Sequence, residues 1–387
     1  MVVWIVNPYD NLPLEGYRPQ RYWLMARAFA RAGHEVTLWT SDFSHAHKSP
    51  RAVQGEVKGD GFAVKMVPTP PYPRNICLKR ILSHRAFARR WRALAEGEAS
   101  PDIVVASLPP LSLGKAAAAF CRRAGAKFVV DVQDAWPETF ERIVPRLLLA
   151  PLRATARRVY RAADAVSGVA RIYLDLAASY GACAPMHLAP LGAELPRAEA
   201  EPPLASDGAL RLVYAGNMGR SYDLATVVDA VKGEPSLHLD LAGAGPDEAA
   251  LRVRAVGCPR IVFHGYLEAA PLRELLATAD AGLVPMFDDS WVGLPGKLAD
   301  YSAAGLPILN SLSGETAALL AEHSAGFTYA AGSTASLLDA VARLRASDRA
   351  ALRAGAASLK AVFDAETVYP AYVRWAENVQ QGREIPK

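Results

Sequence analysis

LRLVYAGNMGRSYDL, which spans Leu210 to Leu224, joins an apolar run to a turn with two glycines and then to a plausible helix start. A continuous apolar run of this length is typical of a strand that is covered on both faces, as in a parallel sheet. The two glycines, Gly216 and Gly219, indicate a tight connection out of that strand. The stretch therefore predicts a strand–turn–helix unit.

The same pattern recurs through the second half of the chain. Four of its six apolar runs end at a glycine or lead directly into one, which puts small residues where open α/β sheets bind ligands. The five further strands that we expect are Leu237–Gly243, Arg260–Gly265, Ala281–Pro285, Pro307–Ser311 and Ala325–Ala330. Each is followed by a plausible helix, so the series predicts a mostly parallel sheet.

The first half of the chain alternates in the same way. We expect strands at Val2–Val6, His34–Thr40, Ala63–Pro68, Asp102–Ser107, Lys127–Val132 and Ala163–Val169, and helices near Arg18–Ala32, Lys79–Ala95, Leu113–Ala124 and Leu147–Ala162. Residues 196–208 are proline-rich and acidic, which indicates a linker. We therefore predict an α/β protein of two doubly wound, Rossmann-like domains facing a central cleft. The domains are residues 1–195 and 196–364, and the C-terminal segment 365–387 packs back on the first domain as a helix.

The bulk composition is that of an ordinary soluble protein, with 387 residues of which 51% are hydrophobic and 21% charged. The four cysteines lie far apart without a C-x-x-C pair, which argues against zinc and against a disulfide framework. The N-terminal apolar run has no basic leader, and no apolar run reaches about 18 residues, so we expect neither a signal peptide nor a membrane span. These features favour a cytoplasmic location.

Charge is divided unevenly along the chain. Residues 1–195 hold 26 Lys and Arg against 16 Asp and Glu, whereas residues 196–387 hold 17 against 23. Two arginine-rich segments, Arg74–Glu96 and residues 146–161, fit either peripheral contact with an anionic membrane or amphipathic helices with arginine on the solvent side. No nucleic-acid-binding motif accompanies the charge, so we do not expect nucleic acid as a partner.

Glycine turns in the second half are suited to a phosphate-bearing ligand. Gly216 and Gly219 let the backbone approach a phosphate that Arg220 can pair with, although the same glycines fit a plain turn with positive φ. A second glycine turn lies in Ala242–Arg252, and a third, His264–Leu267, has a backbone that can pair with a nucleobase edge. None has the G-x-G-x-x-G context of a dinucleotide site.

The loop WVGLPGKLADYSAAGLP, from Trp291 to Pro307, places Gly293, Gly296, Lys297 and Asp300 where we expect a helix to begin. Backbone N–H groups at a helix start, together with a fixed cation, make a site for phosphate. A carboxylate one turn further on can accept hydrogen bonds from a ribose or sugar hydroxyl. The loop therefore predicts a site for a nucleotide-bearing ligand in the second domain.

Polar loops also follow the strands of the first domain. EGYRPQR, Glu15 to Arg21, contains Gly16, which frees the loop, and Arg18 and Arg21, which we expect to direct a positive edge at the cleft. DVQDAWPE places Asp134 at the end of a strand, where it can serve as a hydrogen-bond acceptor or base, or as the N-cap of a following helix.

SDFSHAHK holds two histidines, His45 and His47, two positions apart. That spacing does not suit a helical metal pair and no carboxylate cluster accompanies it, so we expect no metal site. Contact with a substrate and simple solvation of the loop both remain open for these side chains.

Eight stretches in this order resemble the family 4 glycosyltransferases of the GT-B fold, along nearly the whole chain. They are RAFARAGHEVTLWTSDFSH (Arg27–His45), PYPRNICLKRIL (Pro71–Leu82), PDIVVASLPP (Pro101–Pro110), DVQDAWPE (Asp131–Glu138), VYAGNMGRSYDL (Val213–Leu224), LAGAGPDE (Leu241–Glu248), FHGYLE (Phe263–Glu268) and LPGKLADYSAAGLPI (Leu294–Ile308). The chain looks most like the bacterial subgroup that builds lipopolysaccharide, capsule or other surface glycans, including N-acetylfucosamine-type transferases.

The resemblance implies a retaining, metal-independent and cofactor-free transferase. Its donor would be a nucleotide sugar, with a UDP-sugar favoured, on the second domain. It would move a hexosyl or N-acetylhexosaminyl group to a glycan or lipid-linked acceptor on the first domain, in cell-surface polysaccharide biosynthesis. A basic first domain would suit peripheral contact with the inner face of the cell membrane.

The resemblance also implies roles for individual residues. The catalytic residues would be Asp134 together with Arg220 and Lys297, which we take as substitutes for the phosphate-binding Arg and Lys of the family. The donor-binding residues would be Gly216, Asn217, Gly219, Gly243, Gly245, Gly265, Tyr266, Gly293, Leu294, Pro295, Gly296 and Asp300. The acceptor-binding residues would be Gly16, Tyr17, Arg18, Arg21, His45 and Gln133.

The sequence departs from the family pattern in the donor loop. Of the two glutamates usual there, the second aligns with Asp300 and the first falls on Val292, with Asp288 or Asp289 as possible substitutes. Asn217 and Tyr222 occupy the places of the family's Arg and Lys, and Gln133 that of a histidine. Two alternatives therefore stay open: a nucleotide-sugar 2-epimerase of the same architecture, and an inactive partner subunit of a transferase complex.

Overall fold

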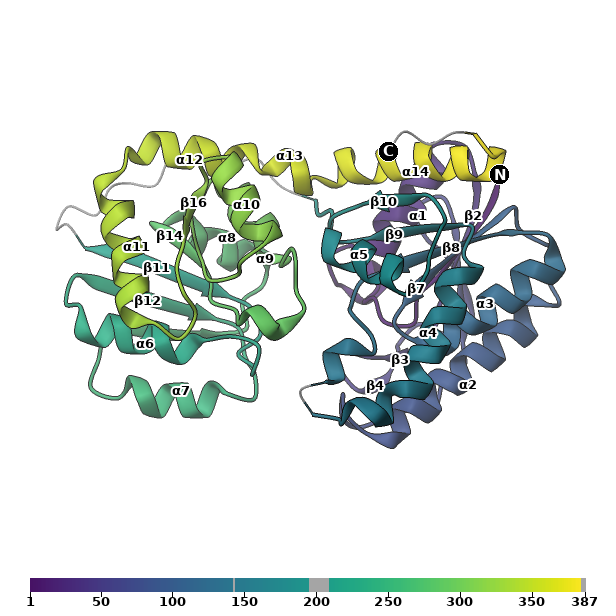
Figure 1. The fold of residues 1–387 in the computed structure, drawn as a ribbon, viewed down its shortest axis with the longest axis horizontal. Helices are drawn as coiled ribbons and strands as arrows, with labels where there is room; N and C mark the ends of the chain where they lie inside the picture. The colour runs from purple at the N-terminus through teal and green to yellow at the C-terminus, as the bar shows by residue number, and fades with distance from the viewer. Residues whose placement is uncertain (142, 195–208, 384–387) are drawn as a thin grey trace. The chain divides into compact units, whose positions relative to one another are not determined.

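The computed structural model describes residues 1–141, 143–194 and 209–383 of the chain (Figure 1). It divides into two compact units, which we describe separately. Unit 1 consists of Met1–Glu194 and Ala365–Lys387, and unit 2 of Leu195–Asp364. This division falls one residue from the boundary expected from the sequence. The linker expected at residues 196–208 lies outside the described residues.

Unit 1 is built on a mostly parallel sheet with the strand order β10-β9-β8-β7-β1-β2-β6-β5. Its strands are β1 (Val2–Val6), β2 (Glu35–Ser41), β5 (Glu56–Lys58), β6 (Ala63–Val67), β7 (Ile103–Leu108), β8 (Lys127–Val132), β9 (Ala165–Gly168) and β10 (Met186–Leu188). Only the edge strand β5 runs antiparallel to its neighbour among the described strands of this sheet. A small antiparallel ribbon, β3 (Phe43–Ser44) with β4 (Ser49–Pro50), follows β2.

Helices cover both faces of this sheet. They are α1 (Arg21–Arg31), α2 (Leu78–Ala95), α3 (Leu111–Ala124), α4 (Ala150–Ala162), α5 (Arg171–Ser179) and α14 (Ala365–Gln381), with single 3-10 turns at Pro13–Glu15, Glu138–Phe140 and Arg146–Leu149. Side chains alternate along β1, so Val3 and Ile5 share a core with α1 and α14. Trp4 points to the other face and stacks on Phe120 of α3.

The C-terminal helix α14 belongs to unit 1 although unit 2 precedes it in the chain. Tyr372 and Trp375 pack in the same core as Phe29 of α1, and Ala365 N donates to Ala193 O at 2.9 Å. The helix therefore closes one face of the unit 1 sheet, as Figure 1 shows in yellow.

Unit 2 is built on a parallel sheet with the order β13-β12-β11-β14-β15-β16. Its strands are β11 (Leu210–Ala215), β12 (Leu237–Ala242), β13 (Ile261–Gly265), β14 (Ala281–Val284), β15 (Ile308–Asn310) and β16 (Gly326–Thr328). Its helices are α6 (Leu224–Gly233), α7 (Glu248–Ala255), α8 (Ala269–Ala277), α9 (Lys297–Ala303), α10 (Glu315–Glu322), α11 (Thr334–Ala346), α12 (Arg349–Ser358) and α13 (Lys360–Phe363), with a 3-10 turn at Asp288–Ser290. The prediction of an α/β chain with two parallel-sheet, Rossmann-like domains is confirmed.

The strand order puts a topological switch point in each sheet. In unit 2 the chain runs outward from β11 through β12 to β13 and then returns to β14 on the other side of β11. In unit 1 it runs from β1 through β2 to β6 and returns to β7 on the other side of β1. Open α/β sheets bind ligands beyond the carboxyl ends of the strands at such points. We therefore expect ligands to bind at the loops after β11 and β1.

Some short elements escaped prediction. The strands β3, β4, β5 and β10 have two or three residues each and carry no apolar alternation that sequence could reveal. The helix expected after Pro137 is only the 3-10 turn Glu138–Phe140. Among the described residues, no helix combines the length and the hydrophobicity that are needed to cross a membrane.

Candidate functional site

The loops after β11, β12 and β13 are hydrogen-bonded to one another at the carboxyl edge of the unit 2 sheet. Gly216 N donates to Ala242 O at 2.9 Å, and Gly243 N donates to Gly265 O at 2.6 Å. Met218 N reaches Ala244 O at 3.0 Å. The structure thus brings the three predicted glycine turns together on neighbouring strands.

Close backbone contact requires glycine at these turns. A Cβ atom on Gly243 would lie 2.0 Å from Gly216 O, and one on Gly245 would lie 2.3 Å from Met218 O. Gly216 itself has φ of 144°, which few other residues adopt. The glycines therefore serve the turns themselves, and by removing side chains they also leave the strand ends open to a ligand.

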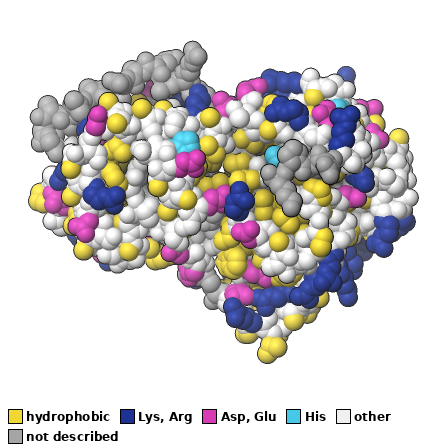
Figure 2. All heavy atoms as spheres, turned by 45° about the horizontal axis from the view of Figure 1, so that its top comes forward, with side chains coloured by type: hydrophobic (Ala, Val, Ile, Leu, Met, Phe, Trp, Pro, Cys, Tyr) yellow, Lys and Arg dark blue, Asp and Glu magenta, His cyan; other side chains and the backbone are white. Residues whose placement is uncertain are grey.

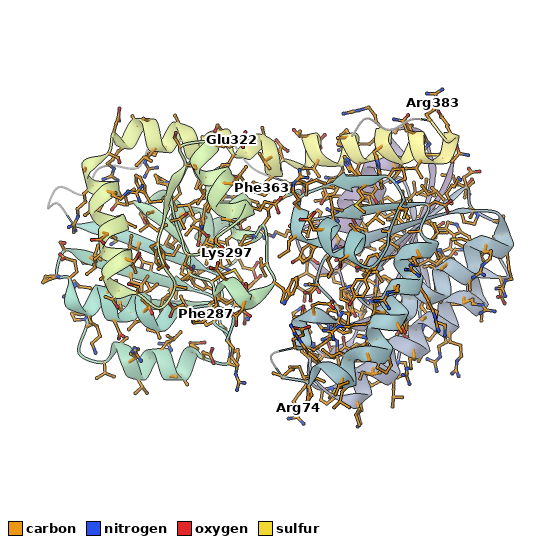
Figure 3. The ribbon with its side chains drawn as sticks, in the orientation of Figure 1. Arg74, Phe287, Lys297, Glu322, Phe363 and Arg383 are labelled. Carbon is orange, nitrogen blue, oxygen red and sulfur yellow. The ribbon has the colours of Figure 1, made fainter. Side chains whose placement is uncertain are left out.

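Lys297 begins helix α9 and places its ammonium group at the end of β11 (Figure 3). Its Nζ lies 4.2 Å from the centroid of the Tyr222 ring and 4.7 Å from that of Tyr214. A Cβ on Gly216 would come within 2.6 Å of the same Nζ. Burial lowers the pKa of Lys297 to about 8, against the smaller opposing effect of the Asp300 carboxylate.

The segment before α9 is anchored in unit 2. Thr316 Oγ1 of α10 donates to Gly293 O at 2.5 Å, which fixes the loop. Leu294 and Pro295 are buried, so the Leu294 side chain packs inside the unit and only its backbone can serve a ligand. Gly296, the residue before α9, is exposed.

Other predicted donor residues lie exposed on the same turns. Asn217 and Arg220 are exposed in the loop after β11, and Asn217 is held by Tyr214 Oη, which donates to its carbonyl oxygen at 2.5 Å. Within the described part of the chain, Arg220 forms no ion pair. Tyr266 follows Gly265 and is 73% exposed. These groups surround a site whose fixed cation is Lys297.

The two suggested substitutes for the missing glutamate, Asp288 and Asp289, are both exposed in the 3-10 turn Asp288–Ser290. Asp288 Oδ1 accepts from Ser313 N at 2.7 Å, so this carboxylate fixes the connection between β15 and α10. Asp300, which aligns with the second glutamate of the family pattern, is half-buried in the first turn of α9. Position 292 itself carries the aliphatic side chain of Val292.

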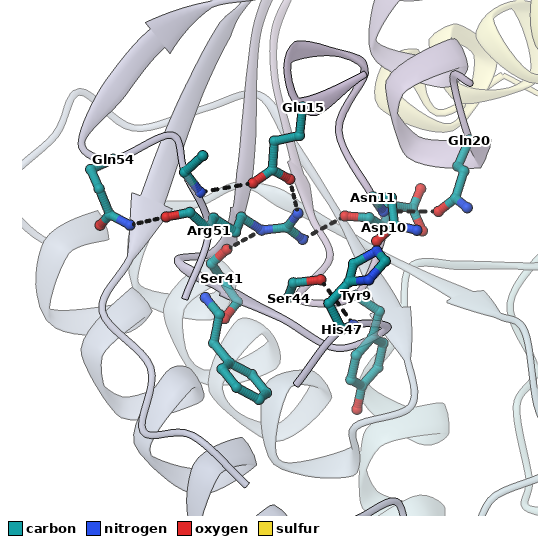
Figure 4. A network of polar contacts seen from close by, with 12 residues as sticks. Tyr9, Asp10, Asn11, Glu15, Gln20, Ser41, Ser44, His47, Arg51 and Gln54 are labelled. Atoms are coloured by element: carbon teal, nitrogen blue, oxygen red, sulfur yellow. Dashed lines mark hydrogen bonds and ion pairs between the residues drawn. The ribbon is translucent and has the colours of Figure 1, made fainter. Parts of the chain in front are cut away.

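In unit 1, the loop after β1 is held by a polar network around Arg51 (Figure 4). Its guanidinium donates to Glu15 Oε2 at 2.7 Å, to Asp10 O at 2.6 Å and to Ser41 O at 2.7 Å. The ring of Tyr17 stacks on His47, with centroids 5.1 Å apart. The network fixes the EGYRPQR loop against the segment after β2, and Gly16 and Arg18 remain exposed on it.

The expectation that Arg21 faces a ligand is wrong. The residue is 4% exposed, and its guanidinium donates to both carboxylate oxygens of Asp131, at 2.8 and 2.7 Å, and to two backbone carbonyls. Tyr22 and Ser167 also donate to that carboxylate. The Arg21 guanidinium and these donors hold the pKa of Asp131 below its usual range despite burial. Arg21 is therefore a structural residue of the interior.

Asp134 lies beyond the end of β8 and caps an irregular turn. Its carboxylate accepts from Thr139 Oγ1 at 2.9 Å and from Trp136 Nε1 at 3.1 Å, and burial raises its pKa. The neighbouring Gln133 has a buried side-chain Nε2 with no hydrogen-bond partner among the described residues. A carboxylate with a raised pKa is a better proton acceptor near neutral pH, so the base role expected for Asp134 is chemically available.

Sequence reasoning missed the side chains that surround His45 and Asp134. His45 Nδ1 is hydrogen-bonded to Tyr72 Oη, and Tyr9 Oη lies 2.9 Å from His84 Nε2. A usable signal was present, because Tyr9, His45 and Tyr72 each follow the carboxyl end of a different strand. These residues extend the predicted acceptor region of unit 1.

In residues 1–141, 143–194 and 209–383, no three His, Cys, Asp or Glu side chains gather closely enough to hold a metal ion.

Family models match both halves of the chain. The glycosyl transferase 4-like domain matches residues 19–192, and glycosyl transferases group 1 matches residues 209–347. No curated protein sequence matches the chain.

Solved structures resemble the chain over its whole length. Sucrose-phosphate synthase from Thermosynechococcus elongatus has a TM-score of 0.78 at 14% identity, covering 98% of this chain and 99% of that one. Anabaena HepE in complex with UDP-glucose has a TM-score of 0.65 at 13% identity, covering 98% and 99%. The apo form of the lipopolysaccharide outer core galactosyltransferase WaaB has a TM-score of 0.65 at 13% identity, covering 99% of each chain. At identities this low, the structural similarity shows a shared fold and nothing more specific.

Proposed function

The chain belongs to the family 4 glycosyltransferases and uses a nucleotide-sugar donor, and we propose that it is a retaining, metal-independent enzyme with a UDP-sugar donor. The observation that carries the proposal is Lys297, a partly buried cation set against Gly216 at the switch point of the unit 2 sheet. The choice of UDP is supported by the Anabaena protein of the same fold, whose structure contains UDP-glucose. The group transferred is a hexosyl or N-acetylhexosaminyl group.

Charge stabilisation at the donor diphosphate explains the need for Lys297. When the nucleoside diphosphate leaves, negative charge develops on its β-phosphate. Lys297 is already desolvated and fixed by two aromatic rings, so it needs little reorganisation as that charge appears. Arg220, exposed on the turn after β11, supplies a second cation that can reach a phosphate.

The route to retention depends on whether a carboxylate nucleophile is available. A double displacement needs such a carboxylate beneath the anomeric carbon. We identify no carboxylate for this role in the described part of unit 2. We therefore favour displacement on the same face, with the leaving phosphate accepting the proton of the acceptor hydroxyl. Asp134, with its raised pKa, is the alternative base.

The surface of unit 1 supports a glycan or lipid-linked acceptor and peripheral contact with an anionic membrane. Two segments of unit 1 expose aliphatic side chains, one next to Arg74 and Lys79 in the sequence and the other next to Arg146, and we call these side chains together the aliphatic patch: Ile76, Leu78, Ile81, Leu82, Ile143, Leu147 and Leu148. Figure 2 shows many Lys and Arg side chains on the same unit, and Figure 3 shows Arg74 pointing outward at its edge. An interface of this composition binds anionic lipid headgroups. We infer a cytoplasmic enzyme at the inner face of the membrane, in cell-surface polysaccharide biosynthesis.

Proton NMR of the anomeric signals tests the proposal. The chain is incubated with a UDP-sugar alone, and then with a lipid-linked sugar acceptor, in the presence of a chelator. We expect UDP release only with acceptor, and a product with the anomeric configuration of the donor. An epimer formed from the UDP-sugar alone would identify a 2-epimerase, and dependence on added metal would contradict metal independence.

Val292 also favours a second candidate, an inactive partner subunit of a transferase complex. Such a subunit would bind no nucleotide sugar. A calorimetric titration that finds no binding of UDP-, GDP- or TDP-sugars would favour it over the enzyme.

A further inference from the structure

Arg80 of α2 is surrounded by aromatic rings at the carboxyl edge of the unit 1 sheet. Its guanidinium carbon lies 5.2 Å from the centroid of Trp136, 5.8 Å from that of Tyr9 and 6.0 Å from that of Tyr72. Tyr9 follows β1, Tyr72 follows β6 and Trp136 follows β8. Three loops from different strands thus converge on one cation at the edge where such sheets bind ligands.

The polar contacts of Arg80 are with neutral groups. Its Nη1 donates to Asn75 O at 2.8 Å, and its Nε donates to His84 Nε2 at 3.3 Å. Burial, together with the charge of Arg80, lowers the pKa of His84 to about 3, so that imidazole is neutral and can accept. Across the described chain, no carboxylate lies within ion-pair distance of this guanidinium.

Lys48 places a second cation beside the first. Its Nζ lies 5.1 Å from the centroid of Tyr72, one of the rings around Arg80, and donates to His45 O. Burial and the nearby guanidinium both lower the pKa of Lys48. As with Arg80, no described carboxylate pairs with it. Two partly buried cations therefore lie beside each other, and the Asp134 carboxylate, which acts on Arg80 from beyond ion-pair distance, pairs with neither.

Such an arrangement gains free energy when an anion arrives. Desolvated charges in proteins are normally paired, because an unpaired one loses hydration without compensation. Arginine held flat by aromatic rings is suited to bind phosphate through two N–H groups, and lysine adds a point charge. The buried, unpartnered Nε2 of Gln133, next to Asp134, offers a further donor in the same region.

We propose that Arg80 and Lys48 bind a phosphate group carried by the acceptor. The site rests on the proposed function, since it gives that acceptor a chemical class. The segment that carries Arg80 also exposes Ile76, Leu78 and Leu82, three members of the aliphatic patch. An anion site next to exposed aliphatic side chains suits a phosphate whose other substituent is a lipid, while a soluble sugar phosphate offers the same anion.

Phosphate binding can be measured apart from sugar transfer. The full chain with Lys297→Met, which weakens the donor site, is titrated calorimetrically with inorganic pyrophosphate and, separately, with a short-chain lipid diphosphate in detergent. We expect Arg80→Gln and Lys48→Gln each to weaken binding of the preferred ligand at least about tenfold, the loss typical of one charged hydrogen-bonded contact. Tighter binding of the lipid diphosphate identifies the lipid source, and equal binding of both identifies the phosphate alone.

Matched controls exist in the same unit. Arg122 and Lys115 are exposed on α3 and form no hydrogen bond or ion pair with the described residues, so Arg122→Gln and Lys115→Gln should leave the affinity unchanged. Equal affinities in the Arg80→Gln and Arg122→Gln proteins would overturn the proposal. If Arg80→Gln fails to fold, the Lys48→Gln variant, whose change lies in a loop, tests the site instead. Arg80→Lys is a second alternative, because it keeps the charge and should bind phosphate more tightly than Arg80→Gln.

Transfer kinetics separate this site from the proposed function. In an active enzyme, Arg80→Gln should raise the acceptor KM and leave the donor KM unchanged. Phosphate binding that depends on Arg80 in a chain that transfers no sugar would sink the proposed function and keep the site. If sugar transfer occurs and the acceptor KM is the same in the Arg80→Gln variant as in the parent protein, the phosphate site is overturned and the proposed function is kept.

Discussion

Lys297 is the residue on which the proposed donor site depends. It lies where a nucleotide diphosphate would bring negative charge, and burial lowers its pKa to about 8. The ammonium is therefore only partly charged in a mildly alkaline solution, and an anion that binds beside it raises that pKa again. Nucleotide binding and protonation of this side chain are consequently linked.

This linkage predicts a pH dependence of UDP affinity. Below pH 8 the free protein already carries the charge, whereas above pH 8 binding must first recruit a proton, so affinity falls as pH rises. Between pH 7 and pH 9 we expect the Kd for UDP to rise about tenfold, in proportion to the fraction of protonated lysine. Calorimetry at a series of pH values measures this change in the Kd for UDP. Lys297→Arg should flatten the profile, and an unchanged slope in that variant would exclude Lys297 as the source.

Gly216 offers a test of the space around the ammonium. An added methyl group would collide with Lys297 Nζ at 2.6 Å and would also strain a backbone with φ of 144°. Gly216→Ala should therefore weaken UDP binding at least about tenfold, because it displaces the cation from the phosphate. Isothermal titration gives the affinity.

The matched control for this variant is Gly233→Ala in the same unit. A Cβ there meets no atom within 4 Å. UDP affinity should be the same in the control as in the parent protein. Equal affinities in the two alanine variants would mean that Gly216 does not border the site.

At the scale of elements, a buried ion pair ties the sheet of unit 1 to its helices. Arg21 of α1 binds Asp131 of β8, and the same carboxylate accepts from Ser167 of β9. Ser167 in turn lies 3.0 Å from Tyr372 Oη of α14. The network joins four elements, including the helix that arrives last in the sequence.

Removing Arg21 should cost stability rather than ligand affinity. Arg21→Met leaves the Asp131 carboxylate buried without its cation, and we expect a loss of about 3–5 kcal/mol in the free energy of unfolding. Arg31→Met on the same helix breaks an exposed pair with Glu366, for which we expect a loss of about 1 kcal/mol or less. Denaturant unfolding compares the two. Similar small losses in both variants would contradict a structural role for Arg21.

The long elements were predictable because their periodicity is strong. β1 and β8 have the bounds expected from the sequence and α14 begins at the expected residue, since each is a continuous apolar run or an amphipathic face. Arg21 was misplaced because a charged residue at a helix start resembles a surface residue until its partner, 110 positions away, is known. Arg80 was missed for a similar reason, since its three rings come from separate loops.

At the scale of the whole molecule, unit 1 carries both the excess of positive charge and the exposed side chains of the aliphatic patch. Leu78 and Leu147 of the aliphatic patch are 78% and 87% exposed. Replacing both by Asp should reduce co-sedimentation with anionic vesicles about tenfold or more, because apolar burial is lost and negative charge is added. High salt should weaken the parent protein's binding as well.

Val253 provides the control for vesicle binding. It is 74% exposed on α7 of the acidic unit 2, so Val253→Asp should leave vesicle binding unchanged. Binding that survives the double replacement in unit 1 would remove the aliphatic patch from the account.

The most direct test of the central claim is a calorimetric titration of the chain and its Lys297→Met variant with UDP-, GDP- and TDP-sugars. The account predicts that one of these donors, a UDP-sugar, binds the parent protein at one site per chain. It predicts that Lys297→Met weakens this binding at least about a hundredfold, since it removes the partly buried cation proposed to bind the diphosphate. Absence of binding by every nucleotide sugar, or equal affinity of the two proteins, would contradict it.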